Sequence, residues 1–135
     1  MGDTTPLRFP VGKLPIRTLK RLLRRNCIKD PRVIVGPAIG EDAAVIDVGG
    51  PRYLIAKTDP ITFTAHRIGW YAVHINANDI ATMGARPLWY LATLLLPEEL
   101  TTEDLSEKIF HDTLEACSSI GVSLIGGHTE ITYGL

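Results

Sequence analysis

A run of nine apolar residues, Leu88 to Leu96, lies between Pro87 and Pro97 and reads LWYLATLLL. The run is too uniformly apolar to show a helical or strand period, but its length between two prolines suits a buried central strand. No apolar run in the chain reaches the roughly 18 residues that a membrane-spanning helix needs. The run therefore predicts a strand in the interior of a folded domain.

The segments around this run predict an α+β domain. The pattern of apolar residues, glycines and prolines gives helices at 16–26, 67–83 and 101–120, and strands at 43–48, 52–58, 88–96 and 122–125. The order helix, strand, strand, helix, strand, helix, strand favours helices on one face of a mainly antiparallel, four-stranded sheet. Gly49-Gly50-Pro51 predicts a hairpin between the first two strands.

Two further local features are expected from the same patterns. Thr101 and Asp104 stand three residues apart, which predicts a capping box at the start of the third helix. The segment from Val33 to Asp42 is punctuated by Gly and Pro and is expected to be a loop. Residues 1–15 are expected to form a loose leader, so that the folded domain is 16–135.

The composition excludes several classes of protein. Of the 135 residues, 45% are hydrophobic and 21% are charged, as in an ordinary globular domain, and the net charge of -1 gives no general attraction to nucleic acid or an anionic membrane. A basic cluster, Lys20 to Arg25, is interleaved with an apolar stripe of Leu19, Leu22 and Leu23. It is better explained by an amphipathic helix with a solvated basic face than by a nucleic-acid patch.

The two cysteines and the N-terminus indicate the compartment. Cys27 and Cys117 lie far apart without a CxxC spacing, which argues against a zinc site and against a disulfide framework. Both are expected to be small, semi-buried hydrophobic residues of a reducing compartment. The first ten residues lack the apolar segment of a signal peptide, so a soluble, cytoplasmic protein is expected.

Polar side chains interrupt the apolar scaffold at the ends of the expected elements. Glu41 and Asp42 precede the first strand; because adjacent side chains of an extended chain point in opposite directions, Asp42 is expected to face inward. Asp59 follows the second strand, and it lies beside Asp42 if the two strands pair as a hairpin. Each acid taken alone also suits an ordinary turn.

A helix and a glycine pair supply the remaining polar positions. Asn76 and Asp79 are neighbours on one face of the apolar second helix, where an acid costs several kcal/mol unless it is paired or bound to a metal. Gly126-Gly127-His128-Thr129 follows the last strand, and its glycine N–H groups are able to approach an anion closely. Carboxylates from separate segments together with glycine N–H groups suit a cation such as Mg²⁺ that bridges phosphate oxygens.

Four segments, in this order, resemble the N-terminal domain of the aminoimidazole ribonucleotide (AIR) synthetase, or PurM-like, superfamily. They read IGEDAAVI, AKTDPITFTAH, INANDIATMGARPLWY and LIGGHTEIT. The resemblance covers roughly Val33 to Glu130. It implies two copies of the domain that pair their sheets into a barrel, and a cleft for ATP and Mg²⁺ that a second, C-terminal domain helps to shape; that second domain is missing from this chain.

The resemblance also assigns roles to individual residues. It implies metal binding by Asp42, Asp59 and Asp79, with Glu41, His128 and Glu130 as further candidate ligands. It implies nucleotide contacts from the following residues: Lys57, Thr58, Asn76, Gly126, Gly127 and Thr129. His66 falls where the thiamine-monophosphate kinases of the superfamily have a histidine on the substrate side.

Two positions depart from the pattern of the superfamily. Glu41 replaces the usual first Asp and keeps its charge. His128 stands where the kinases and dehydratases have Asp and the purine enzymes have Glu, and imidazole is a poor ligand for Mg²⁺. Glu130 is able to compensate from two residues away, or the site holds fewer metals.

The resemblance leaves the branch of the superfamily open. Asn78-Asp79 resembles hydrogenase-maturation proteins, and His66 with MGARPLWY resembles the kinases, whereas Cys27 lacks the glycine-rich surroundings of the selenophosphate synthetase nucleophile. The leading expectation is the Mg-ATP-binding, homodimeric part of an enzyme that phosphorylates an amide or phosphate oxygen, on a small molecule or a protein terminus. The alternatives are a degenerate nucleotide-binding module and a purely structural dimerisation domain.

Overall fold

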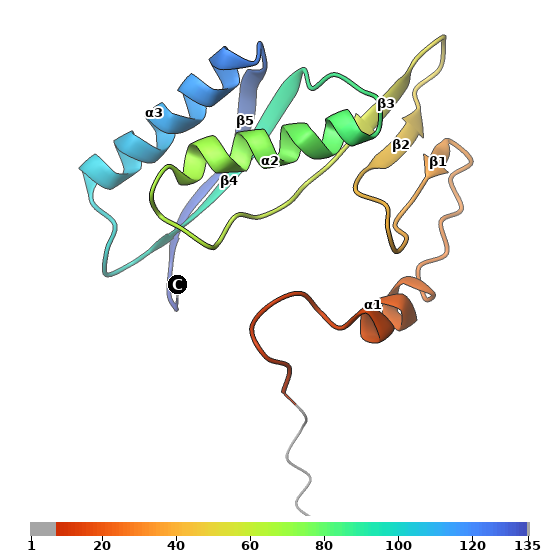
Figure 1. Cartoon of the computed structure of the whole chain (residues 1–135), viewed down its shortest axis with the longest axis horizontal. Helices are drawn as coiled ribbons and strands as arrows, with labels where there is room; N and C mark the ends of the chain where they lie inside the picture. The colour runs from red at the N-terminus through yellow and green to blue at the C-terminus, as the bar shows by residue number, and fades with distance from the viewer. Residues whose placement is uncertain (1–7, 135) are drawn as a thin grey trace, which may run out of the picture.

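The computed structural model describes residues 8–134 and contains helices and strands in the order α1, β1, β2, β3, α2, β4, α3, β5 (Figure 1). Their bounds are α1 Ile16–Leu23, β1 Val33–Val35, β2 Ala44–Asp47, β3 Tyr53–Ala56, α2 Ile68–Thr82, β4 Trp89–Pro97, α3 Glu103–Ser119 and β5 Ser123–Thr132. Positions 1–7 of the expected leader lie outside the described residues, and positions 8–15 contain no helix or strand.

The strands form two separate sheets, so the expected four-stranded sheet is wrong. One sheet is antiparallel and has the order β1-β2-β3, and the other consists of β4 and β5 in parallel. The parallel pairing has a simple cause: β4, α3 and β5 follow one another as strand, helix, strand, and such a crossover returns the chain in the same direction. The α+β class and the placement of α2 and α3 on one face of β4–β5 agree with the expectation (Figure 1).

Strand β1 occupies part of the segment that was expected to be a loop. Val33 pairs with Ile46 and Val35 with Val45, with an irregularity between them, so β1 extends the hairpin of β2 and β3 by one short strand. The predicted hairpin itself is confirmed, with Ala44 paired to Ala56 and Asp47 paired to Tyr53.

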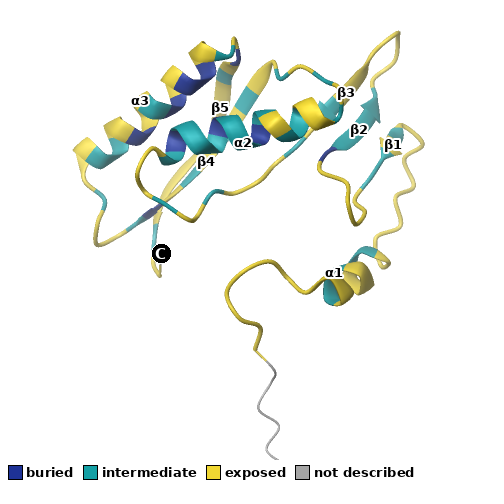
Figure 2. Ribbon diagram, in the orientation of Figure 1, coloured by how far each residue is buried: buried dark blue, intermediate teal, exposed yellow. Residues whose placement is uncertain are grey.

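The core lies where α2 and α3 meet the beginnings of β4 and β5. The buried cluster consists of Val73, Ala116, Cys117 and Val122. In Figure 2 the buried positions of α2 and α3 lie mostly on the sides where the helices face each other. Gly69 allows this close approach, because a Cβ atom there would stand 2.6 Å from the carbonyl oxygen of Ile109 and 2.8 Å from the backbone nitrogen of Thr113.

The helix ends differ in detail from the expectations. The cap of α3 is Thr102, whose Oγ1 accepts a hydrogen bond from the N–H of Leu105 at 3.1 Å, so no capping box starts at Thr101. The hydroxyl of Thr101 instead donates to the carbonyl of Pro97 at 2.6 Å. Helix α1 ends at Leu23, three residues before the predicted end, and has no buried residue.

The two cysteines have different environments. Cys117 is buried in the core, as expected, but Cys27 is exposed, so the expectation of a semi-buried Cys27 is wrong. Position 27 lies between the end of α1 and the start of β1, outside both elements. Among the described residues, no helix is both long and apolar enough to cross a bilayer.

Strand β4 alternates between two environments along its length. Trp89, Leu91 and Leu95 are exposed by 61%, 66% and 52%, whereas Tyr90 and Leu96 face the helices and are shielded. On β5, Ile125 is also exposed, whereas the exposed Ile131 pairs with Leu96 and therefore lies on the helix side. Because the chain buries only one side of β4, Trp89, Leu91 and Leu95 leave the opposite side as an apolar surface.

Candidate functional site

The beginning of β2 and the end of β3 lie side by side, which brings two of the predicted acids to the same end of the hairpin. Ala44 pairs with Ala56 in the antiparallel register. Asp42 stands two residues before Ala44, and Asp59 stands three residues after Ala56. Both carboxylates are on exposed residues.

Lys57 connects this end of the hairpin to α2. Its Nζ lies 2.8 Å from Oδ2 of Asp79, and the two side chains are only 14% and 22% exposed. Burial by itself lowers the pKa of Lys57, but the hydrogen bond and the charge of Asp79, together with the charges of Asp59 and Asp42, outweigh it and raise the pKa. Lys57 is thus paired with Asp79 and feels the charges of Asp59 and Asp42, but among the described residues the three aspartates do not form a group of ligand atoms within 4.8 Å of one another.

Asn76 adds a buried oxygen on the same face of α2. Its side-chain Nδ2 donates to the carbonyls of Ala72 at 2.9 Å and of Asp59 at 3.1 Å, and these two acceptors fix which way the amide points. Its Oδ1 is buried and has no hydrogen-bond partner among residues 8–134. This oxygen belongs to the amide that contacts Asp59, and without a partner it suits a cation or a hydrogen-bond donor of a ligand.

By their chemistry these residues suit a hard divalent cation, because carboxylate and amide oxygens are the ligands that Mg²⁺ prefers. They come from three separate segments of the chain. Thr58, adjacent to Asp59, is exposed and offers a hydroxyl. Glu41 is exposed as well, and its backbone N–H donates a hydrogen bond to the carbonyl of Ala38.

The glycine pair does not form a loop after a strand, which corrects the expectation of a phosphate loop there. Gly126 and Gly127 lie within β5, which runs on to Thr132 and pairs them with Leu91 and Ala92 of β4. The register shifts between Tyr90 and Leu91, and a Cβ atom on Gly127 would clash with the backbone of Ala92. Close strand contact therefore explains the need for glycine at position 127.

His128 and Glu130 form a separate pair on β5. His128 Nε2 lies 3.5 Å from Glu130 Oε2, and both side chains are more than half exposed. No ion pair of the described residues joins them to the three aspartates. Thr129 lines a hollow of about 370 Å³ whose other lining residues are Ala92, Leu94, Phe110, Leu124, Gly126, Gly127 and His128.

His66 lies in the exposed segment that leads into α2. Its N–H donates to Oγ1 of Thr64 at 3.1 Å, which forms a tight local turn. The next residue, Arg67, has a positive φ of 54° and places its guanidinium 5.1 Å from the ring centre of Trp70. The ring centres of Trp70 and His74 are 4.1 Å apart. These ring contacts hold the start of α2, and the exposed His66 lies in the turn before it.

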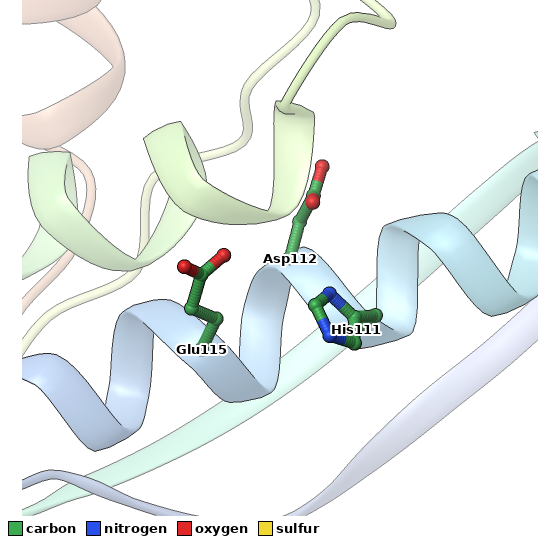
Figure 3. Close-up of side chains that lie close together, drawn as sticks. All are labelled: His111, Asp112 and Glu115. Carbon is green, nitrogen blue, oxygen red and sulfur yellow. The ribbon is translucent and has the colours of Figure 1, made fainter.

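A second acidic cluster, which the sequence reasoning missed, lies on α3. His111, Asp112 and Glu115 each offer one ligand atom within 4.8 Å of the others, and Figure 3 shows them rising from one stretch of the helix. The spacing of one and four residues on a helix was the available signal. His111 also lines an open hollow of about 450 Å³ with Ser106, Glu107, Phe110 and Leu114. All three ligands come from one helix, and His111 and Glu115 are exposed, so water competes for any cation there.

Solved structures of known proteins share this fold. AaThiL complexed with AMPPCP and TMP superposes with a TM-score of 0.64 and 22% sequence identity, over 87% of this chain and 36% of that chain. A thiamine monophosphate kinase from Aquifex aeolicus superposes with a TM-score of 0.57 and 20% identity, over 87% and 37% of the two chains. At these identities the likeness establishes the fold, an α+β domain of the PurM-like kind.

The sequence places the chain in a family. The family "AIR synthase related protein, N-terminal domain" matches residues 40–134, and this chain belongs to that family. A selenide, water dikinase from Haemophilus ducreyi is 34% identical over 122 residues, and one from Pasteurella multocida is 31% identical over 122 residues. In both pairs the match covers 87% of this chain and 35% of the relative, so the chain spans about a third of the length of these relatives.

The names of these relatives bear on the branch of the superfamily. Both relatives are named selenide, water dikinases, and this is the selenophosphate synthetase branch that the surroundings of Cys27 were expected to disfavour. The absence of glycines around Cys27 therefore does not separate this chain from selenide, water dikinases.

Proposed function

We propose that this chain binds Mg²⁺ and the phosphates of ATP as the N-terminal domain of an ATP-dependent enzyme that transfers a phosphoryl group. The observation that supports the proposal is the shielded pair of Lys57 with Asp79, under the charges of Asp59 and Asp42 and on the same helix as the unpaired Oδ1 of Asn76.

Each residue of the group has a distinct part in this proposal. Asp42, Asp59 and Asp79 hold the metal, which neutralises charge on the phosphates when it is bound. Asn76 Oδ1 accepts a hydrogen bond or completes the ligand set. Thr58 and Lys57 donate to phosphate oxygens, and His66 contacts the acceptor substrate.

The acceptor is an amide or phosphate oxygen, or a selenide as the names of the curated relatives suggest. Members of one superfamily are able to differ in the acceptor while they share the phosphate site, because the acceptor is chosen by other residues. The chain's share of the reaction is to position the reactants and to neutralise charge, without a covalent intermediate on a side chain.

A homodimer is the second part of the proposal. The exposed apolar side chains of β4 and β5, including Trp89, Leu91 and Ile125, are suited to pairing with the same surface of a second copy. Such pairing would close two sheets face to face into a barrel and remove this surface from water. His128 and Glu130 would then lie in or near the shared interior.

A thermal-shift series with Mg-ATP tests the site. We expect Mg-ATP to raise the melting temperature of the 135-residue chain weakly, and Asp42→Asn or Asp59→Asn to abolish the rise. Asp112→Asn is the matched control, because it removes one carboxylate from the α3 cluster and leaves the predicted site intact. A rise that survives in Asp42→Asn and Asp59→Asn but is lost in Asp112→Asn would move the site to α3.

Two alternatives remain as different classes of protein. A degenerate nucleotide-binding module would bind Mg-ATP without turnover, and His128→Asp would restore activity in the longer enzyme. A structural dimerisation domain would show no Mg-ATP shift in any variant, yet would still dimerise through β4 and β5.

A further inference from the structure

We propose that the ammonium group of Lys57 changes its partner. It forms an ion pair with Asp79 while no metal is bound, and it contacts the nucleotide phosphates when a divalent cation binds Asp79. This exchange rests on the proposed function, and it adds a role that binding alone does not require. The exchange couples the binding of the metal to the binding of the nucleotide.

The starting state of the exchange is visible in the structure. Lys57 Nζ and Asp79 Oδ2 are 2.8 Å apart, and both side chains are largely shielded from water. A shielded charge is stable only with a partner, so in the metal-free chain the ammonium and the carboxylate need each other. The ammonium therefore occupies Oδ2, one of the two oxygens that Asp79 offers to a metal.

The same contact explains why the partners have to change. A divalent cation on Asp79 places a second, larger positive charge beside the ammonium, and two cations cannot share one carboxylate oxygen without strong repulsion. Lys57 stands immediately after the end of β3 on a flexible four-carbon stem, so its Nζ is able to swing while the backbone stays in place. Phosphate oxygens that enter with the metal provide the next acceptor.

The nearest rival explanation is a permanent structural ion pair. In that case Lys57 would stay on Asp79 with the metal present, and Lys57→Met would still tighten Mn²⁺ binding, because a positive charge is lost beside Asp79. The nucleotide separates the two explanations: a permanent pair predicts unchanged AMPPCP binding at saturating Mg²⁺ in Lys57→Met, whereas the exchange predicts weaker AMPPCP binding, because Lys57 then contacts phosphate. Unchanged AMPPCP binding in a folded Lys57→Met therefore overturns the exchange.

The experiment measures Mn²⁺ binding, as an oxygen-seeking substitute for Mg²⁺, by electron paramagnetic resonance on the 135-residue chain. In Lys57→Met we expect Mn²⁺ alone to bind about five- to tenfold more tightly than in the unchanged chain. In the same variant we expect AMPPCP, at saturating Mg²⁺, to bind about tenfold more weakly, because one charged contact to phosphate is lost. Lys108→Met removes an exposed lysine of α3 and should change neither constant.

A second variant keeps the test valid if Lys57→Met does not fold. Lys57→Arg retains the charge, but its planar guanidinium is able to pair with a carboxylate through two hydrogen bonds. Mn²⁺ should therefore bind this variant about two- to threefold more weakly than the unchanged chain. Tighter Mn²⁺ binding in Lys57→Arg, or equal or weaker Mn²⁺ binding in a folded Lys57→Met, overturns the exchange. If AMPPCP with Mg²⁺ still binds the unchanged chain in that case, the proposed function stands without it. If the unchanged chain binds neither Mn²⁺ nor AMPPCP, the proposed function fails and the exchange fails with it.

Discussion

The side-chain amide of Asn76 donates a hydrogen bond of 3.1 Å to the backbone carbonyl of Asp59, and this contact joins the loop after β3 to the middle of α2. The two residues are 17 positions apart, so the bond fixes tertiary structure and not a local turn. Asn76 is only 8% exposed. The position of Asp59, a proposed metal ligand, thus depends on a side chain that does not carry charge.

Asn76→Ala should therefore destabilise the chain by about 1–3 kcal/mol, because two carbonyl acceptors lose their donor in a shielded place. Urea unfolding followed by circular dichroism measures the change. Asn78→Ala is the matched control, since Asn78 lies on the exposed side of the same helix and should change stability by less than about 0.5 kcal/mol. Equal effects of the two substitutions would contradict a tertiary role for Asn76.

Gly69→Ala should also destabilise the fold, although alanine is the better helix former. The added methyl group would enter the contact between α2 and α3, 2.6 Å from the carbonyl oxygen of Ile109. We expect a loss of about 1–3 kcal/mol, which exceeds the gain of about 1 kcal/mol in helix propensity. Ala81→Gly, at an exposed position of α2, measures propensity alone and should cost about 1 kcal/mol. A stabilised Gly69→Ala variant would show that the helices are able to move apart at little cost.

The two thiols should differ in reactivity. Cys27 is exposed, whereas burial raises the pKa of the Cys117 thiol. With Ellman's reagent at pH 8 we expect one fast equivalent, absent in Cys27→Ser, and a second that is slower by about a hundredfold or more and is released by denaturant. Two fast equivalents would mean that the core around Cys117 opens readily.

The same burial gives a sign for the dependence of stability on pH. The pKa of Cys117 is higher in the folded chain than in the unfolded chain, so the folded state binds this proton more tightly. Stability is therefore unaffected by this group at neutral pH and falls as the pH rises through the ordinary range of a thiol. Urea midpoints measured between neutral and alkaline pH should show that decline.

The sequence predicts those parts of the fold that local patterns control. The hairpin of β2 and β3, the long apolar α2 and the presence of a strand between two prolines follow from turn residues and apolar runs, and the structure confirms them. The buried, central position expected for that strand is wrong, because β4 belongs to a two-stranded sheet and one of its sides is exposed. The expectation that Asp42 lies beside Asp59 needed only the register of that hairpin. The α3 cluster was missed although its spacing was visible, because exposed acids on a helix rarely bind metal.

The errors about the sheets and the glycine pair have a different origin, since they depend on contacts between distant segments. The pairing of β4 with β5 is parallel because α3 crosses between them, whereas the strand count alone suggested one antiparallel sheet. Gly126 and Gly127 were interpreted as a loop, but the partner strand β4 extends β5 through them. No sequence pattern indicated that Lys57, and not a nearby arginine, would meet Asp79.

The exposed side of β4 carries the last prediction. Leu91 is 66% exposed and stands among other exposed apolar side chains of β4, a surface that a second copy of the chain would cover. Leu91→Glu would place a charge in such an interface, where a carboxylate without a partner is costly, so the proposed dimer should dissociate. Sedimentation equilibrium should show monomers for this variant at concentrations where the unchanged chain is dimeric.

Leu100→Glu provides the comparison that separates an interface from general solubility. Leu100 is 69% exposed, about as much as Leu91, but it lies between β4 and α3, outside either element. This variant should therefore remain dimeric. If both variants become monomers, or if the unchanged chain is monomeric at every concentration, the apolar side of β4 does not join two copies of this chain, and another partner has to cover it. If only Leu91→Glu dissociates, the contact includes the middle of β4, which is the geometry that two sheets closing into a barrel require.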